Sequence, residues 1–193
     1  MITLTAGEIA LLVGGVLHCD KDLLVSKAPV FDSRKAVPGC IFLALQGEVV
    51  DGHDFAADAY RAGAMFSLTT KRIDGPCIVV EDVIDALSVL ATFVRKRLTN
   101  LTVIGITGSQ GKTSTKDLMS HMLAAVGPTV SPAGSFNNDL GLPITLLECD
   151  EKTRFCILEM GARHSRDIAR LCSIAAPNIG VVLTVGTAHL GEF

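Results

Sequence analysis

The sequence predicts an α/β protein, with a small N-terminal α/β domain over residues 1–98 and a mostly parallel-sheet region over residues 99–193. Apolar segments and helical patterns alternate in the second half, which is typical of a parallel sheet with right-handed crossovers. A glycine-rich loop joins the first of these apolar segments to a helical pattern. The polar pair Thr99-Asn100 separates the two halves.

In the first half, the clearest local signals are helix starts and turns. Thr5-Ala6-Gly7-Glu8 has the capping-box pattern and should open a helix. Pro38-Gly39 predicts a turn before a strand, and Asp54 is placed to cap the next helix. The expected elements are strands over 40–45, 65–68 and 78–80, a helix from Asp54 to Ala64, and an amphipathic helix over 82–98.

The second half carries the alternation of strand and helix. The expected strands cover 101–106, 154–158 and 179–183, and the expected helices cover 113–125, 140–147 and 165–174. Pro143 falls in the first turn of its helix, where proline is tolerated. Because ligands of such sheets collect at the carboxyl ends of the strands, we look there for a site.

Composition excludes several classes of protein. The net charge is −3 and the basic residues are scattered, so no nucleic-acid footprint is expected. The one basic run, Arg95-Lys96-Arg97, is interpreted as a solvated helix end. The 6 cysteines form no C-x-x-C pair, which favours reduced thiols over zinc ligands. No apolar stretch is long enough to span a bilayer, so we expect a soluble, cytoplasmic protein.

The most informative stretch is Val103-Ile104-Gly105-Ile106-Thr107-Gly108-Ser109-Gln110-Gly111-Lys112-Thr113-Ser114. Glycines let a loop aim its N–H groups at phosphate oxygens, the next helix adds its positive end, a lysine can neutralise the β/γ-phosphates and a threonine hydroxyl can bind Mg²⁺. The strict P-loop pattern is not met, because Ile106 stands where its first glycine belongs. A plain glycine turn is the alternative. The residues expected to bind a nucleotide are Gly108, Ser109, Gln110, Gly111, Lys112, Thr113 and Ser114.

Two further side chains lie at or after strand ends and could share one crevice with the loop. Glu159 ends one expected strand and His189 follows another, so with Thr113 they could bind a divalent metal beside the phosphates. Glu159 could instead cap a turn, and His189 could be an ordinary surface or core histidine. Asn137 and Asn138 read as a turn, or as a helix start beside the nucleotide.

Several motifs together resemble the Mur ligases of peptidoglycan synthesis. They are T-G-S-Q-G-K-T, F-N-N-D-L-G-L-P, E-M-G-A-R-H and V-G-T-A-H-L in the second half, and D-S-R-K-A-V-P-G-C-I-F-L-A-L-Q-G-E-V-V-D-G-H-D-F in the first. They occur in order and cover nearly the whole chain. The resemblance implies a substrate domain over residues 1–98 that binds a UDP-muramoyl peptide. It also implies a partial P-loop ATPase domain over 99–193.

The resemblance also implies an activity. ATP would phosphorylate the terminal carboxylate of UDP-N-acetylmuramoyl-tripeptide, and D-alanyl-D-alanine would attack the acyl phosphate. Lys112, Glu159 and His189 would be catalytic, and Thr113, Glu159 and His189 would hold Mg²⁺. Asn137 or Asn138 would contact the nucleotide or the water shell of the metal.

For the first half, the resemblance implies that Ser33, Arg34 and Gln46 contact the UDP substrate. A guanidinium suits a diphosphate, and the alternative is a salt-bridged surface arginine. Thr184 and Thr187 depart from the family, which often has an asparagine and an acidic residue at these positions.

The family also continues beyond the equivalent of Phe193, with a modified lysine, adenine-binding groups and a domain for the incoming amino compound. We therefore expect this chain to be an N-terminal portion of a ligase, without turnover on its own. The rival hypotheses are a non-catalytic nucleotide-binding fragment and another P-loop ATP-dependent enzyme.

Overall fold

The computed structural model describes residues 1–132, 134, 136–184 and 186. The chain divides into two compact units, Met1–Leu90 and Ala91–Phe193, and the division falls within the long helix α3 (Val83–Arg97). The expectation of a mixed α/β protein with a mostly parallel sheet in its second half is confirmed. The functional division between residues 98 and 99 stays a prediction.

The first unit is built on a four-stranded sheet in the order β2-β6-β5-β4. Strands β4, β5 and β6 are parallel, and β2 is antiparallel to β6. The bounds are β2 Val16–His18, β4 Ile41–Leu43, β5 Phe66–Thr69 and β6 Cys77–Val79, with helices α1 Ala6–Val13 and α2 Ala56–Ala62 and 3-10 turns η1 Ser33–Lys35 and η2 Gly52–Phe55. A separate two-stranded sheet pairs β1 (Leu4–Thr5) with β3 (Leu24–Val25).

Helix starts in this unit show one correct prediction and one wrong one. The capping box of α1 is confirmed, since Glu8 N–H donates to Thr5 Oγ1 at 3.1 Å and Thr5 N–H donates to Glu8 Oε2 at 2.8 Å. Asp54 does not cap the next helix. Asp51 accepts the N–H of His53 at 3.0 Å and opens the turn η2, which runs directly into α2.

The second unit is a four-stranded sheet in the order β10-β7-β9-β8, parallel throughout. Its strands are β7 Thr102–Thr107, β8 Thr129–Val130, β9 Phe155–Glu159 and β10 Ile179–Val182, and its helices are α4 Lys112–Ala124, α5 Gly141–Leu147 and α6 Asp167–Ala175. The two-residue strand β8 was not expected, because so short a segment carries no periodicity.

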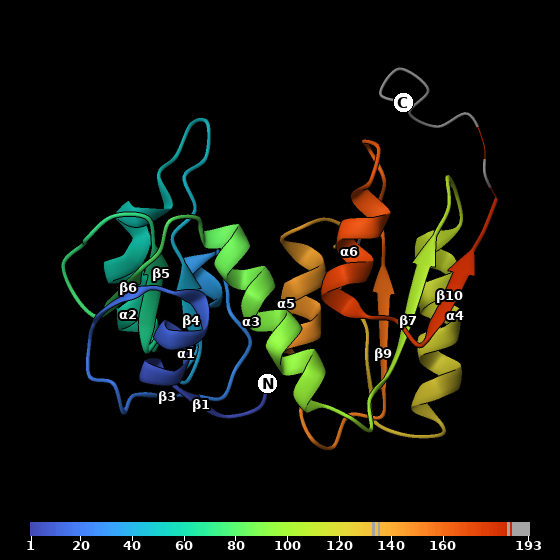
Figure 1. The fold of residues 1–193 in the computed structure, drawn as a ribbon, viewed down its shortest axis with the longest axis horizontal. Helices are drawn as coiled ribbons and strands as arrows, with labels where there is room; N and C mark the ends of the chain where they lie inside the picture. The colour runs from blue at the N-terminus through green and yellow to red at the C-terminus, as the bar shows by residue number, and fades with distance from the viewer. Residues whose placement is uncertain (133, 135, 185, 187–193) are drawn as a thin grey trace. The chain divides into compact units, whose positions relative to one another are not determined.

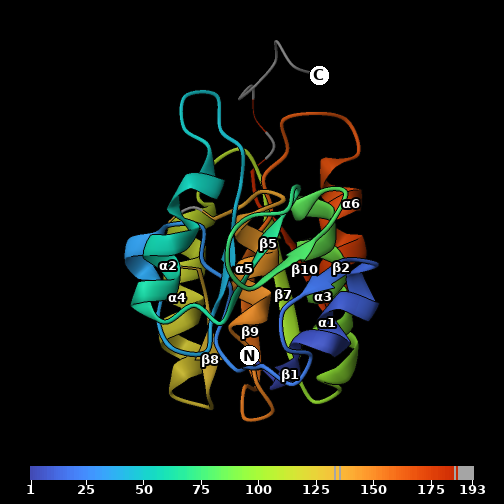
Figure 2. The same cartoon turned by 90° about the vertical axis from the view of Figure 1, so that its left-hand side faces the viewer.

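Helices cover both faces of this sheet, with α4 on one and α5 and α6 on the other (Figures 1 and 2). On the α4 face, Ile104, Ile106 and Ile157 form a buried cluster with Met119 and Leu123. Because the strands are parallel, their carboxyl ends meet at one edge of the sheet, which we call the carboxyl edge. None of the helices in the described part of the chain is long and apolar enough to cross a membrane.

Arg95, near the end of α3, is not the solvated residue expected from the sequence. Its guanidinium donates to the carbonyl oxygens of Ala175 at 3.0 Å and Ala176 at 3.1 Å, at the carboxyl end of α6. It also donates to Asn178 Oδ1 at 2.9 Å, and the same oxygen accepts the N–H of Val103 at 2.8 Å. The last turns of α3 are thereby fastened to α6 and to the start of β7.

Candidate nucleotide-binding site

The glycine loop between β7 and α4 adopts a conformation that requires its glycines. Gly108 has φ +145°, and a Cβ there would lie 2.8 Å from Cβ of Leu183. Gly111 has φ +84° and immediately precedes the first turn of α4. Both values belong to the region that side chains disfavour. The first turn of α4 therefore opens onto the loop, as in a helix start that binds anions.

Lys112 is the first residue of α4 and folds back over the loop. Its Nζ donates to the carbonyl oxygen of Gly108 at 2.5 Å. The side chain is half-buried, and this hydrogen bond keeps its positive charge at the loop. A phosphate entering the loop would therefore meet an ammonium group that has only to exchange a neutral carbonyl for an anion.

Glu159 ends β9 beside the loop and is only 1% exposed. Thr113 Oγ1 donates to Glu159 Oε2 at 3.3 Å, a long hydrogen bond. Its other oxygen, Oε1, has no hydrogen-bond partner among the described residues. A buried carboxylate with an unsatisfied oxygen is costly unless a cation compensates it.

These oxygens suit Mg²⁺, which prefers hard ligands and keeps several waters. Within the described residues, no group of three or more His, Cys, Asp and Glu side chains is arranged to hold a metal. Thr113 and Glu159 could therefore bind Mg²⁺ together with phosphate oxygens and water rather than as a closed protein cage. His189, the other expected ligand, lies outside the described residues.

The chain after β10 is tied to the loop through Ser109. The N–H of Ser109 donates to Thr184 O at 2.9 Å, and Gly186 N–H donates to Ser109 Oγ at 2.9 Å. The backbone and hydroxyl of Ser109 thus form hydrogen bonds that stabilise the conformation of the loop. Gln110 and Ser114, the remaining residues expected at the nucleotide, are exposed.

The two asparagines behave differently. Asn138 Oδ1 accepts the N–H groups of Leu140 at 3.3 Å and Gly141 at 2.9 Å, so it caps the start of α5. Asn137 O accepts the N–H of Gly161 at 2.8 Å, two residues past Glu159. A Cβ on Gly161 would lie 3.0 Å from Cγ of Asn137. Asn137 therefore lies at the carboxyl edge beside Glu159, and its carboxamide forms no hydrogen bond within the described residues.

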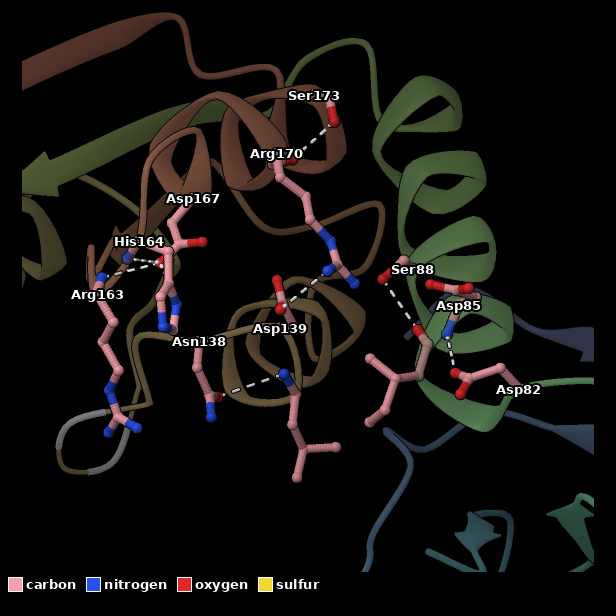
Figure 3. A network of polar contacts seen from close by, with 12 residues as sticks. Asp82, Asp85, Ser88, Asn138, Asp139, Arg163, His164, Asp167, Arg170 and Ser173 are labelled. Atoms are coloured by element: carbon pink, nitrogen blue, oxygen red, sulfur yellow. Dashed lines mark hydrogen bonds and ion pairs between the residues drawn. The ribbon is translucent and has the colours of Figure 1, made fainter. Parts of the chain in front are cut away.

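A polar network holds the loop between β9 and α6 (Figure 3). Asp167 Oδ2 accepts the N–H groups of His164 and Arg163, both at 2.8 Å, and these bonds lower the pKa of Asp167. Arg170 of α6 pairs with Asp139 at 3.3 Å, next to the cap of α5. Arg166 has φ +76°, an unfavourable value for a residue with a side chain. These contacts order the loop after Glu159 and link α6 to the start of α5.

In the first unit, the residues expected at a UDP substrate follow two segments that run parallel to each other. A parallel bridge pairs Val30 with Phe42, so the chains leading to Ser33 and to Gln46 run in the same direction. Arg34 donates from Nε and Nη2 to the two oxygens of Asp32, both at 2.8 Å. This pair lowers the pKa of Asp32 to about 2. Arg34 is therefore a salt-bridged surface arginine here, the alternative weighed from the sequence.

A second polar network of this unit, centred on Asp51 and His53, was not predicted from the sequence. His53 Nδ1 lies 2.5 Å from Asp51 Oδ1, and His53 Nε2 accepts the N–H of Thr70 at 3.3 Å. Lys71 Nζ donates to Asp51 Oδ2 at 2.8 Å, and the bonds from Lys71 and His53 hold the pKa of Asp51 well below its usual range. These contacts tie the segment after Gln46 to the end of β5, so His53 shapes a loop.

Lys116 is the functional candidate that sequence reasoning missed. It is 4% exposed, and its Nζ donates to Pro132 O at 2.9 Å. Lys116 lies three residues before Met119 and seven before Leu123, on the side of α4 that faces the sheet. This spacing could have predicted from the sequence that Lys116 is buried.

Comparisons with known proteins agree with this arrangement. Residues 30–95 match the family described as Mur ligase family, catalytic domain, and residues 106–193 match the Mur ligase middle domain. Two curated relatives are UDP-N-acetylmuramoyl-tripeptide–D-alanyl-D-alanine ligases. The one from Mycobacterium tuberculosis H37Rv is 48% identical over 100% of this chain and 43% of its own length. The one from Escherichia coli K12 is 37% identical over 100% of this chain and 42% of its own length.

Solved structures give the same result. MurF from Acinetobacter baumannii superposes with a TM-score of 0.88 at 36% identity, over 99% of this chain and 43% of that one. MurF ligase from Thermotoga maritima in complex with ADP gives 0.73 at 36% identity, over 85% of this chain and 39% of that one. The chain spans less than half the length of the curated relatives it matches. The two family matches, the identities and the shared fold together show that the chain belongs to the Mur ligase family.

Proposed function

We propose that this chain is the UDP-substrate- and ATP-binding portion of a ligase that joins D-alanyl-D-alanine to UDP-N-acetylmuramoyl-tripeptide. The names of the curated relatives and the ADP complex of a solved relative support this proposal. The observation that carries it is the buried Glu159 carboxylate, with one oxygen unsatisfied among the described residues, beside Thr113 and the glycine loop. Such a reaction would draw on ATP and nucleotide-linked precursors, so the proposal includes a cytoplasmic location.

The reaction would transfer the γ-phosphoryl group of ATP to the terminal carboxylate of the peptide. The amine of D-alanyl-D-alanine would then attack the acyl phosphate carbon, and inorganic phosphate would leave. Phosphoryl transfer depends mainly on positioning and charge neutralisation. Lys112 would exchange Gly108 O for the β/γ-phosphates, and Thr113 and Glu159 would hold Mg²⁺, with His189 a further ligand implied by the family.

The substrate side of the proposal rests on Ser33, Arg34 and Gln46. Arg34 would turn its guanidinium from Asp32 toward the diphosphate of the UDP group, since both partners offer paired oxygens to the same fork of donors. Its side chain is 86% exposed, so it can turn without unpacking the core.

Calorimetric titration of ATP, with and without Mg²⁺, tests the proposal. The wild-type chain should bind ATP more tightly with Mg²⁺, whereas Glu159→Gln should bind equally with and without it, because the carboxylate that attracts the cation is gone. Lys152→Met, a change at an exposed lysine of the same unit, is the matched control and should behave as wild type. The same Mg²⁺ dependence in Glu159→Gln and wild type would contradict the proposed metal site.

A further inference from the structure

Lys116 is a buried cation that the proposed chemistry does not use. It lies one helical turn after Lys112 on α4, and its ammonium group donates to Pro132 O at 2.9 Å and lies 2.8 Å from Asp117 Oδ1. A buried lysine needs such partners, because an unpaired ammonium would be strongly destabilised. Met or Leu could be buried at the same position of the helix at a lower cost in free energy. The presence of a lysine with a polar contact therefore needs an explanation.

A second side chain of α4 holds the same stretch of chain. Ser120, four residues after Lys116 and therefore on the same side of the helix, lies with its Oγ 3.0 Å from Ser131 Oγ. Pro132 itself is buried. Two polar contacts in successive turns thus attach residues 131 and 132 to the helix that begins with Lys112 and Thr113.

The chain that leaves this attachment reaches the carboxyl edge five residues later, at Asn137. There Asn137 O accepts the N–H of Gly161 at 2.8 Å, just past Glu159. Ser131 and Pro132 are therefore attached to α4, and Asn137 is attached to the loop after β9. A shift of Pro132 would change where Asn137 lies relative to the glycine loop and Glu159.

We infer that Lys116 is a positioning residue, which sets the place of Asn137 at the nucleotide by holding Pro132 against α4. The inference rests on the proposed function, because it assigns Asn137 to the bound ATP–magnesium complex. Lys116 itself touches neither nucleotide nor metal in this account. It acts only through the backbone that it holds.

A double-mutant cycle separates this role from a general structural one. Lys116→Met and Asn137→Ala should each weaken ATP–magnesium binding by about tenfold in calorimetry. The double variant should bind no more weakly than Asn137→Ala alone, since Lys116 acts through Asn137. Lys116→Arg keeps a donor and should recover most of the lost affinity. If the losses of the two single variants multiply in the double variant, the inference is overturned.

Controls distinguish the remaining outcomes. Lys152→Met should bind as wild type, and far-UV circular dichroism should show each variant folded. If Lys116→Met does not fold, Ser120→Ala takes its place as the milder change at the same attachment. It should weaken binding by about twofold to threefold in wild type and not at all in Asn137→Ala. Unchanged binding in the folded Lys116 variant, or in Ser120→Ala where that replaces it, overturns the inference alone. Absence of ATP–magnesium binding by wild type overturns the proposed function and this inference with it.

Discussion

The residues expected to bind ligands carry differently paired charges in the two units. In Met1–Leu90, Arg34 and Asp32 neutralise one another at the surface, and Asp51 is held by both Lys71 and His53. In Ala91–Phe193, Glu159 is buried with one oxygen unsatisfied among the described residues, and Lys112 donates to the neutral carbonyl of Gly108. The carboxylates of the first unit are thus compensated by neighbouring side chains, whereas the buried Glu159 carboxylate is compensated only in part.

The largest effect is expected at Lys112. Lys112→Met should weaken ATP–magnesium binding by about 100-fold, because charge-assisted bonds to phosphate are lost while the backbone loop stays intact. Isothermal calorimetry measures this, with Lys152→Met as the control. Equal affinities in Lys112→Met and wild type would remove the ground for calling this loop a nucleotide site.

A smaller effect is expected at Arg34. Arg34→Ala should weaken binding of UDP-N-acetylmuramoyl-tripeptide by about tenfold, since only the charge-assisted bonds to the diphosphate are lost. Arg61→Ala, which removes another exposed arginine paired with an aspartate of the same unit, is the matched control. If the two variants bind the substrate equally well, Arg34 has no role in the site.

The contrast between the units predicts a gain of stability at Glu159. Glu159→Gln should raise the free energy of unfolding of the ligand-free chain by about 1 kcal/mol, because it removes a buried charge with poor compensation. Urea denaturation followed by circular dichroism measures the change. Asp32→Asn, at a carboxylate already paired with Arg34, should bring no such gain. A destabilised Glu159→Gln variant would show that the carboxylate is already satisfied.

The smallest effect is expected at Arg166. Arg166→Gly should stabilise the chain by about 0.5–1 kcal/mol, since glycine adopts a φ of +76° without the steric cost that a side chain brings. The mirror-image control is Gly14→Ala, which places a side chain at φ +64° and should destabilise by a similar amount. Thermal unfolding of both variants tests whether strain is stored in the loop after β9.

Sequence patterns predicted the structure correctly where the environment of a residue depends on its neighbours along the chain. The β-branched run of β7, the glycines before α4 and the capping box of Thr5 are local in this sense, and the structure has each of them. Glu159 was found because a polar residue at the end of a buried strand must face the carboxyl edge. Its metal role, like that of His189, stays a prediction.

The features that could not be predicted from the sequence are of two kinds. Some depend on partners distant in the chain, and others on two nearby residues that could play the same role. Lys116 looks like any helical lysine until Pro132 is placed beside it. Asp51 and Asp54 are equally good caps by type, and only the hydrogen bonds show that Asp51 starts the turn. Strand β8 consists of two residues that gain their order from pairing with β9.

The guanidinium of Arg95 decides how the two units can be separated for study. Expression of the second unit from residue 99 onward would leave the carbonyl groups of Ala175 and Ala176 without their donor and Asn178 with one contact fewer. A shorter N-terminal trim, starting at Ala91, would retain the side chain and the helical turn that carries it.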